Sequence, residues 1–420
     1  MGYESTESAP RQPDDVATFA TDSWIGRSLP DDAAYMRRAI ALAHRGEGWC
    51  HPNPMVGAVI VKNGVIIGEG YHARCGQLHA ERNAIASLRE PADGSTLYVT
   101  LEPCCHYGRT PPCTEALIEN HIARVIIGSR DPNPKVHGKG AATLREHGIE
   151  VHEDFLRDEC DELNPVFFHY ITTHTPYVRM KYAMTLDGKT ATRTGASKWI
   201  TGEESRRYVH FLRHTSMGIM VGIGTALADD PLLTCRIDGG RNPTRIVCDS
   251  TLRLPVDSQL VKTAHDVPTI VACAPGADDT RRTALESHGV EVLECPVSDD
   301  GGIDLATLMR LLGDREIDSV LLEGGGTLNA SALEAGIVDE VDCFVAPQIF
   351  GASPHTPVSG SGVATPSGSA KFTTVDVRRF GNDVMLQCIA SPANPTGQAN
   401  AGRAEPSGAT QSDTTQSREA

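Results

Sequence analysis

The chain has 420 residues, of which 40% are hydrophobic and 22% are charged, and its formal net charge is −16. This length exceeds one ordinary core and indicates two domains of a soluble globular protein. The acidic balance argues against a nucleic-acid-binding surface, which would be basic. The sequence contains neither the roughly 18-residue apolar run of a membrane span nor a secretory hydrophobic segment at its start.

Twelve cysteines are spread along the chain without the spacing of a disulfide framework. Free thiols persist in reducing compartments, so this usage predicts a cytoplasmic protein. Residues 1–30 and 392–420 are polar and lack hydrophobic periodicity, and both are expected to be disordered tails. The sequence leaves open whether the chain forms a homo-oligomer.

Helix and strand signals alternate through a first domain at 31–173, which predicts an α/β sandwich. The predicted elements are helices over 33–44, 80–88, 113–120, 141–146 and 158–170, and strands over 56–61, 65–70, 95–101 and 123–128. Asp31 is expected to cap the first helix, and Asn63-Gly64 is expected to form a tight hairpin. A polar, proline-ended junction at 172–176 marks the domain boundary.

A second α/β domain is expected at 174–391. Its predicted elements are helices over 203–213 and 329–335 and strands over 177–185, 189–191, 218–221, 320–322, 342–346, 372–377 and 384–388, with further short strands near 246, 270 and 292. Asp187-Gly188 is expected to turn the first of these strands into a hairpin. The acidic segment at 227–231 is expected to be a turn.

The stretch from 79 to 113 carries the strongest chemical signal. It contains His79-Ala80-Glu81, then Pro103-Cys104, then Cys113 behind two prolines. One imidazole and two thiolates leave the fourth position of a zinc ion open for water. Bound zinc lowers the pKa of that water towards neutrality, and Glu81 is the candidate for proton transfer. His-x-Glu with Pro-Cys and a later Cys is the general signature of zinc deaminases acting on nucleobases.

His79 and Cys113 are both expected at helix starts, where the helix dipole favours the thiolate that a metal needs. The alternatives are buried structural cysteines or a closed structural zinc site. The compact deaminase signature has about two residues between its cysteines, whereas eight separate Cys104 from Cys113. Cys105 and His106 lie in this gap and could compete as ligands. We retain Cys104 and Cys113 because Cys113 stands at a helix start.

The strand at 320–322 leads directly into Glu323-Gly324-Gly325-Gly326-Thr327. Glycines let backbone N–H groups approach a phosphate closely, and the following helix start favours an anion. The pattern equally suits a plain strand-to-helix turn, and it is not the fingerprint of a Rossmann domain. Arg213 and Arg236 could bind a substrate phosphate, although each alone also suits a surface salt bridge. These residues predict a nucleotide-binding α/β domain.

Taken together, these segments resemble the bifunctional riboflavin-biosynthesis deaminase–reductases. The matching segments are HPNPMVGAVIV, GEGYH, HAE, TLEPCCHYGRTPPC and DPNP in the first half, and KYAMTLDGKTA, SKWIT, LADDPLLT and LEGGGTLNASALEAGIVDE in the second. The resemblance spans about 35–389, and the long gap between the two cysteines agrees with this family's form. Cys105 stands where a small serine-like residue is expected.

The resemblance implies a fold and an activity for each domain. The first would be a cytidine-deaminase-like α/β/α sandwich, and the second a dihydrofolate-reductase-like α/β domain. The first, with one Zn²⁺ per chain, would deaminate 2,5-diamino-6-ribosylamino-4(3H)-pyrimidinone 5′-phosphate, a small phosphorylated pyrimidine. The second would use NADPH to reduce the ribosyl group to a ribityl chain.

The resemblance also implies roles for individual residues, carried over motif by motif. The NADPH-binding residues would be Ala183, Trp199, Thr225, Asp229, Ser250, Gly325, Gly326, Thr327, Leu328, Asn329, Ala330 and Ser331. The reductase substrate would be bound by Ser197, Arg213, Leu233, Arg236 and Glu323. The deaminase substrate would be contacted by Asn53, Arg109 and Asn133.

Two functions of other classes are alternatives to this one. A nucleic-acid-editing deaminase would need a basic groove and stacking aromatics, but the chain is acidic and only 5% aromatic. A non-enzymatic zinc-stabilised module would prefer a fourth protein ligand and would leave Glu81 without a role. A measurement of ammonia release from the phosphorylated pyrimidine, from cytidine and from single-stranded DNA distinguishes these two functions from the deaminase–reductase.

Overall fold

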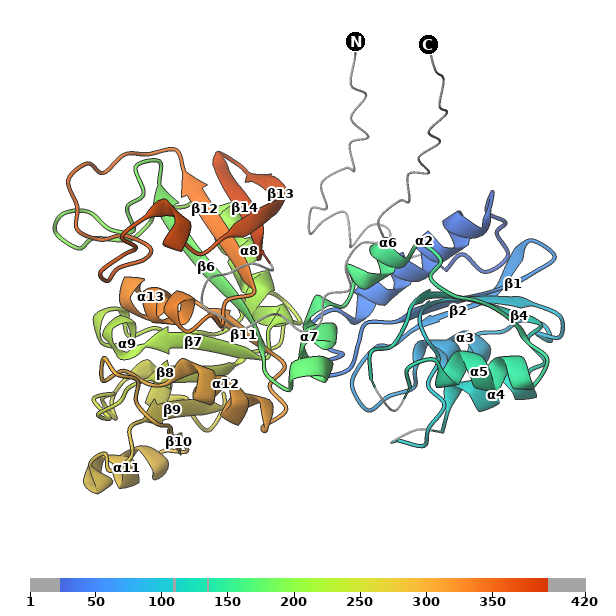
Figure 1. Cartoon of the computed structure of the whole chain (residues 1–420), viewed down its shortest axis with the longest axis horizontal. Helices are drawn as coiled ribbons and strands as arrows, with labels where there is room; N and C mark the ends of the chain where they lie inside the picture. The colour runs from blue at the N-terminus through green and yellow to red at the C-terminus, as the bar shows by residue number, and fades with distance from the viewer. Residues whose placement is uncertain (1–22, 109–110, 134–135, 392–420) are drawn as a thin grey trace, which may run out of the picture.

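The structure is a computed structural model that describes residues 23–108, 111–133 and 136–391. In these ranges the chain forms two α/β bodies, each with its own sheet, joined through helix α7 (Pro165–Thr173) (Figure 1). None of the described helices combines the length and apolarity needed to cross a membrane.

A five-stranded sheet forms the centre of the N-terminal body. Its strands, in sheet order, are β2 (Val65–Tyr71), β1 (Gly57–Lys62), β3 (Thr96–Leu101), β4 (Arg124–Ser129) and β5 (Glu150–His152). Strand β1 is antiparallel to both neighbours, whereas β3, β4 and β5 run parallel. The helices are α2 (Asp32–Ala43), α3 (Ala80–Ala86), α4 (Cys113–Glu119), α5 (Lys139–Glu146) and α6 (Arg157–Asp161), with a 3₁₀ turn η1 (His44–Gly46).

Side chains of β1 alternate between two separate cores. Ala58 and Ile60 pack with α3, α4 and α5, whereas Val59 and Val61 pack with α2 and the region of α6. Helices therefore cover both faces of the sheet (Figure 1), because each strand presents an apolar side chain to each face. The predicted α/β/α sandwich is confirmed.

Local signals at two turns are also confirmed. Asp31 accepts a hydrogen bond from the backbone N–H of Ala34 and so caps α2. Asn63 and Gly64 both have positive φ, 50° and 76°, as a two-residue hairpin between β1 and β2 requires.

A nine-stranded sheet forms the centre of the C-terminal body. Its strands, in sheet order, are β10 (Glu291–Glu294), β9 (Thr269–Cys273), β8 (Thr244–Cys248), β7 (Gly218–Gly222), β11 (Ser319–Leu322), β6 (Tyr177–Thr185), β12 (Glu340–Ala346), β14 (Asp383–Ala390) and β13 (Phe372–Phe380). The first seven strands run parallel to one another. Strand β14 is antiparallel to both of its neighbours, β12 and β13. The helices are α8 (Glu203–Thr215), α9 (Ile223–Asp229), α10 (Gln259–Lys262), α11 (Asp279–Glu286), α12 (Leu305–Gly313) and α13 (Gly326–Glu334), with a 3₁₀ turn η2 (Pro366–Gly368).

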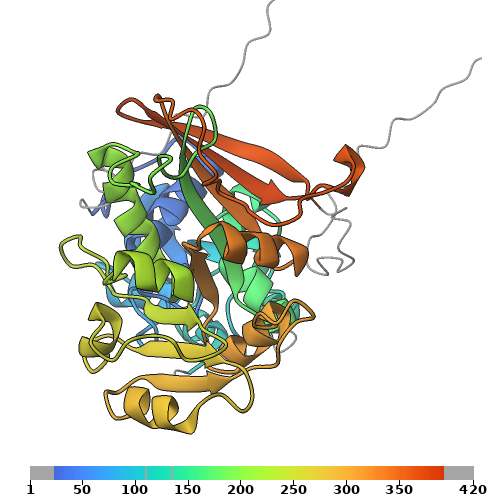
Figure 2. The same cartoon turned by 90° about the vertical axis from the view of Figure 1, so that its left-hand side faces the viewer.

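Helices cover both faces of this long sheet as well (Figures 1 and 2). Apolar side chains of α12 and α13 pack on one face, and those of α9, α10 and α11 pack on the other. Strands that are covered on both faces are apolar throughout, which is why they appear in the sequence as short continuous apolar runs. The dihydrofolate-reductase-like α/β class predicted for this body is confirmed.

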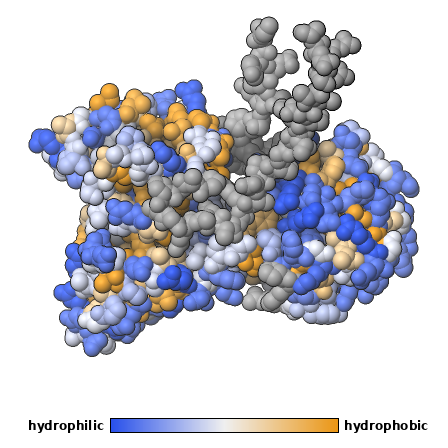
Figure 3. All heavy atoms as spheres, viewed as in Figure 1, coloured by the Kyte–Doolittle hydropathy of each residue, from blue (hydrophilic) through white to orange (hydrophobic). Residues whose placement is uncertain are grey.

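The outer strand β13 gives the long sheet an apolar edge. Val375 and Val377 are 51% and 55% exposed, and hydrophobic residues gather over this end of the sheet in Figure 3. The pairing register shifts between Thr374 and Asp376. A bulge at this place interrupts the edge, which is one way in which proteins discourage edge-to-edge pairing.

The predicted N-terminal tail is too long, because its last residues pack on the first body. Trp24, Ile25 and Leu29 lie against the core beneath α2. The backbone N–H of Gly26 donates to Ile66 in strand β2, which has an open edge. Backbone pairing of this kind leaves no hydrophobic periodicity in the sequence. Residues 1–22 and 392–420 lie outside the described residues.

The single helix predicted at 158–170 is wrong, since α6 and α7 are separate. Pro165 begins α7, and a proline disfavours the helical conformation in the residue before it. Asn164 accordingly has φ −129° and ψ 39°. Its side chain instead bonds the backbone N–H and carbonyl of Met55.

The strand predicted at 189–191 does not form. The Asp187 carboxylate accepts the backbone N–H groups of Phe350 and Gly351. The N–H of Thr190 then donates to the carbonyl of His355, so the chain leaves the sheet to pack on another loop.

Two boundaries in the second body also differ from prediction. The acidic segment at 227–231 is largely helical, because α9 continues to Asp229 and only Asp230 turns, with φ 39°. The helix predicted to begin at 329 begins three residues earlier, at Gly326.

The two bodies meet through polar contacts around a shared cavity of about 240 Å³. His51 Nδ1 lies 2.6 Å from Asp318 Oδ2, and the Tyr170 hydroxyl donates to the carbonyl of Gly313 at 3.0 Å. Gly48 has φ 75°, and a Cβ at this position would overlap with the His214 ring. Residues 174–176 connect α7 to β6 and are the direct covalent link between the bodies.

Candidate functional site

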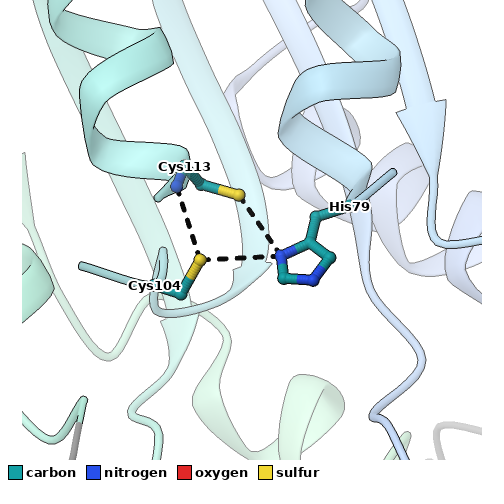
Figure 4. A group of neighbouring side chains, drawn as sticks. All are labelled: His79, Cys104 and Cys113. Carbon is teal, nitrogen blue, oxygen red and sulfur yellow. Dashed lines mark hydrogen bonds between the residues drawn. The ribbon is translucent and has the colours of Figure 1, made fainter. Parts of the chain in front are cut away.

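His79, Cys104 and Cys113 come together beside the end of β3 (Figure 4). His79 Nδ1 lies 3.6 Å from Cys104 Sγ and 3.4 Å from Cys113 Sγ. Ordinary zinc–nitrogen and zinc–sulfur bonds in tetrahedral geometry place such atoms about 3.5 Å apart. The spacing therefore fits a zinc ion bound by three protein ligands, and neither Cys105 nor His106 belongs to this group.

Two helix starts and one loop position these three side chains. His79 is the N-cap of α3, and Cys113 is the first residue of α4. Cys104 follows β3 by three residues, and its sulfur accepts the backbone N–H of Cys113 at 3.4 Å. The helix starts predicted at His79 and Cys113 are confirmed. Both helix dipoles favour negative charge at this point.

The pKa values of the two thiols are shifted in opposite directions. Contact with the Cys113 side chain lowers the pKa of Cys104 to about 4, and His79 and the Cys113 N–H act in the same direction against the effect of burial. Contact with Cys104 and burial raise the pKa of Cys113 well above its ordinary value. A divalent cation would hold both groups as thiolates and would remove this conflict. The donor set thus fits a metal.

Glu81 is buried beside this group, two residues after His79 in the first turn of α3. Burial raises the pKa of its carboxyl, and the charge of Cys104 acts in the same direction. A carboxyl with a raised pKa exchanges protons more readily near neutral pH, as acid–base catalysis requires.

The three residues predicted to contact the deaminase substrate differ in their relation to this centre. Asn53 Nδ2 is 3.3 Å from His72 Nε2, and the His72 ring meets the His79 ring edge-on at 5.4 Å between centroids. The backbone N–H of Asn133 donates to Asp131, and burial raises the pKa of Asp131 to about 6. Arg109 lies outside the described residues.

A second polar group lies at the carboxyl end of β11. Arg213 donates two hydrogen bonds to Glu323, at 2.7 and 3.1 Å, and Lys181 Nζ lies 3.5 Å from the same carboxylate. Burial alone would raise the pKa of Glu323, but Arg213 and Lys181 outweigh it and hold the pKa at about 2. Arg213 therefore forms a largely buried ion pair and not the surface salt bridge that was the alternative.

The glycine turn after Glu323 leaves the start of α13 open. Gly325 is its N-cap, no side chain caps the helix, and its first turn contains no acidic residue. A Cβ at Gly326 would overlap with Ser359, and a Cβ at Gly325 would lie 3.2 Å from Thr225 Oγ1. The side-chain oxygen of the buried Asn329 has no partner among the described residues. These features fit a phosphate bound by backbone N–H groups.

The other predicted residues of the second body lie along the same edge of the sheet or on adjoining loops. Ala183 is on β6, Asp229 ends α9, and Ser250 follows β8. Leu233 is buried, while Ser197 and Trp199 are exposed on the loop after β6. Neither Ser197 nor Trp199 bonds to the other predicted residues within the described ranges; Trp199 instead lies under the Arg206 guanidinium at 4.6 Å.

Several neighbours of these groups were missed by the sequence analysis. They are His72 and Asp131 in the first body, and Lys181 and His210 in the second. Lys181, His72 and Asp131 could have been suspected, because they belong to the segments KYAMTLDGKTA, GEGYH and DPNP. His210 gives no comparable signal, since its partner Arg236 lies 26 residues away in the sequence.

Two protein families match separate parts of the chain. Residues 29–129 match the cytidine and deoxycytidylate deaminase zinc-binding region, and residues 176–386 match the RibD C-terminal domain. Riboflavin biosynthesis protein RibD of Actinobacillus pleuropneumoniae is 52% identical over 360 residues, which is 85% of this chain and 95% of the relative. RibD of Escherichia coli (strain K12) is 39% identical over 377 residues, with 86% and 100% coverage.

Solved structures agree with these relatives. A deaminase/reductase from Thermotoga maritima, described as acting on diaminohydroxyphosphoribosylaminopyrimidine and 5-amino-6-(5-phosphoribosylamino)uracil, is 40% identical with a TM-score of 0.76. The match covers 85% of this chain and 98% of that one. Acinetobacter baumannii RibD is 37% identical with a TM-score of 0.77, and the match covers 86% and 99% of the two chains.

Proposed function

This chain belongs to the RibD family of riboflavin-biosynthesis enzymes, and from that premise we propose how its own residues divide the work. It is a bifunctional enzyme, a zinc-dependent deaminase and an NADPH-dependent reductase that acts on small phosphorylated pyrimidines. We assign the deaminase to residues 23–173 and the reductase to residues 174–391. The first body takes in residues 23–30 because Trp24, Ile25 and Leu29 pack on its core.

In the deaminase, we propose that His79, Cys104 and Cys113 hold the zinc ion. Zinc, when bound, supplies the activation of water at neutral pH. Glu81 accepts a proton from the attacking water and delivers it to the amino group that leaves as ammonia. A C–O bond forms and a C–N bond breaks at the same ring carbon, so one carboxylate serves both proton transfers. Asn53, Arg109 and Asn133 are assigned to substrate binding.

In the reductase, we propose that the open start of α13 binds the phosphates of NADPH. NADPH supplies the hydride that, with a proton, converts the ribosyl group to a ribityl chain. The cofactor-binding set comprises Ala183, Trp199, Thr225, Asp229, Ser250 and the turn from Gly325 to Ser331. Ser197 and Leu233 are assigned to the substrate, beside the Arg213–Glu323 pair. Arg213 and Lys181 share the Glu323 carboxylate, whereas Arg236 has no carboxylate partner within the described ranges, so we assign the substrate phosphate to Arg236.

We also infer a cytoplasmic location. None of the twelve cysteines, all of which lie within the described residues, forms a disulfide. A reducing compartment preserves free thiols, whereas an oxidising one pairs them.

The converging His79, Cys104 and Cys113 side chains, with Glu81 buried beside them, are the observation that carries the proposal. The test supplies the diamino-pyrimidinone phosphate to the full-length protein with and without NADPH. We expect ammonia release in both reactions and the ribityl product only with NADPH. Ammonia release from cytidine but not from this phosphate would overturn the proposal.

A further inference from the structure

Arg236 is an exposed cation that follows α9, and within the described ranges no carboxylate lies within ion-pair distance of it. Its Nε donates a hydrogen bond to His210 Nε2 at 3.2 Å. An arginine side chain of this length usually samples many rotamers, and a bond at Nε restricts the plane of the guanidinium. The partner that restricts Arg236 is therefore a histidine.

The histidine accepts this bond in its neutral form. A guanidinium can only donate, so Nε2 of His210 must present a lone pair and the ring proton must lie on Nδ1. Burial lowers the pKa of His210 to about 4, and the charges of Arg213 and Arg236 act in the same direction. Glu323 and the Thr234 backbone act in the opposite direction without reversing the shift. The acceptor is therefore present at neutral pH.

The segment that carries Arg236 is tied to α8 at several points. His210 and Arg213 lie three residues apart on α8 and so face the same side. Arg213 Nη1 donates to the carbonyl of Thr234 at 3.0 Å, and Cys235 Sγ donates to the carbonyl of His210 at 3.4 Å. These bonds place Arg236 next to the largely buried Arg213–Glu323 pair.

We propose that His210 is a positioning residue of the reductase site. Its Nε2 accepts the Nε–H of Arg236, fixes the guanidinium plane and leaves both terminal NH₂ groups for the phosphate of 5-amino-6-(5-phosphoribosylamino)uracil. The proposal rests on the role assigned to Arg236 above. It adds that a neutral imidazole, which touches neither substrate nor cofactor, sets the affinity for the phosphorylated substrate.

The test uses the full-length protein and three replacements of His210. Gln places a carbonyl acceptor near the position of Nε2, whereas Asn places it near Nδ1, and Leu removes the acceptor. We expect His210→Leu and His210→Asn to raise KM for the phosphorylated substrate about tenfold with little change in kcat, and His210→Gln to restore most of the loss. Arg207→Ala, which removes an exposed cation from the same helix, should leave KM unchanged.

The dephosphorylated substrate separates positioning from a general loss of structure. With it, wild type and His210→Leu should have the same KM, because Arg236 then has no phosphate to bind. Equal KM values for His210→Leu and wild type on the phosphorylated substrate, or an equal rise on both substrates, would overturn the role of His210. An Arg236→Ala variant with unchanged KM would instead overturn the role assigned to Arg236.

Discussion

Glu81 lies beside the two thiolates and the imidazole, and its burial accounts for its raised pKa. Replacing Glu81 by Gln keeps the shape of the side chain but removes its ability to carry a proton. General acid–base groups contribute about 10²–10⁴-fold, so we expect ammonia release to fall by at least the lower figure. Zinc content, measured on the same sample, should stay at the wild-type level. Near-normal ammonia release would contradict the role of Glu81.

Cys113 and Cys105 offer a matched pair of substitutions at the same centre. Cys113 Sγ lies 3.4 Å from His79 Nδ1, whereas Cys105 lies outside the three-residue group. Cys113→Ser should lose most of the bound zinc and all measurable deamination, because a serine hydroxyl is a poor zinc ligand at neutral pH. Cys105→Ser should keep both. Metal analysis that finds the reverse pattern would make Cys105 the ligand.

Glu323 gives the reductase body a defined response to acid. Its folded-state pKa is held at about 2, below the roughly 4.3 expected in the unfolded chain. Between these two pKa values the unfolded state binds more protons than the folded state. The free energy of unfolding therefore falls as pH falls from about 4.5 to about 2. Urea unfolding of the C-terminal body should show this slope, and Glu323→Gln should be less stable at neutral pH but flatter in acid. An equal slope in both proteins would assign the acid response to other carboxylates.

Sequence alone identified the residues whose spacing is local. His79 and Glu81 are two residues apart, and the prolines before Cys113 mark a helix start, so the motif is visible without a fold. His210 was not found, because its partner Arg236 is brought to it only by the packing of the segment after α9 on α8. Lys181 begins the segment KYAMTLDGKTA, but its contact with Glu323 could not be predicted, because it depends on β6 and β11 being neighbours.

At the scale of elements, the start of α13 is the feature on which cofactor binding depends. Gly325→Val would place a branched side chain between this helix start and Thr225, since even a Cβ there lies 3.2 Å from Thr225 Oγ1. We expect the Kd for NADPH to rise about tenfold or more, a loss of roughly 1.4 kcal/mol. Fluorescence titration measures this change. Ammonia release by the same variant should be unchanged, and a loss of deamination with normal NADPH binding would show that the cofactor turn is misassigned.

Helices and strands were predicted correctly where one hydrophobic periodicity dominates the sequence. They were predicted wrongly where tertiary contacts determine the backbone conformation. Strand β6 was expected over its full range, because apolar residues run along it and a turn follows. Helices α6 and α7 were merged, since the amphipathic pattern continues across Pro165 while the backbone does not. Helices α10, α11 and α12 were not predicted. Length alone does not explain this, because α3 and α4 have only seven residues each and were predicted. Packing on the sheet stabilises helices that are too short to form alone.

At the scale of the whole molecule, the contact between the bodies can be tested without touching either site. Gly48→Ala would place a Cβ against the His214 ring at a position with φ 75°. Gly94→Ala is a matched control, because Gly94 has φ 76° and nothing lies within 4 Å of its Cβ position. We expect only Gly48→Ala to separate the thermal unfolding of the two bodies into two calorimetric transitions. Both activities should remain, and identical scans for the two variants would show that this contact does not couple the bodies.

The three-residue connection between α7 and β6 also determines how the two activities are supplied to the cell. Each ribosome that completes the deaminase goes on to complete the reductase, so the two catalysts are always made in equal numbers. Regulation of expression then changes both rates together and cannot adjust one against the other. Whether the deaminated intermediate accumulates is therefore set by the turnover of each site and by the supply of NADPH.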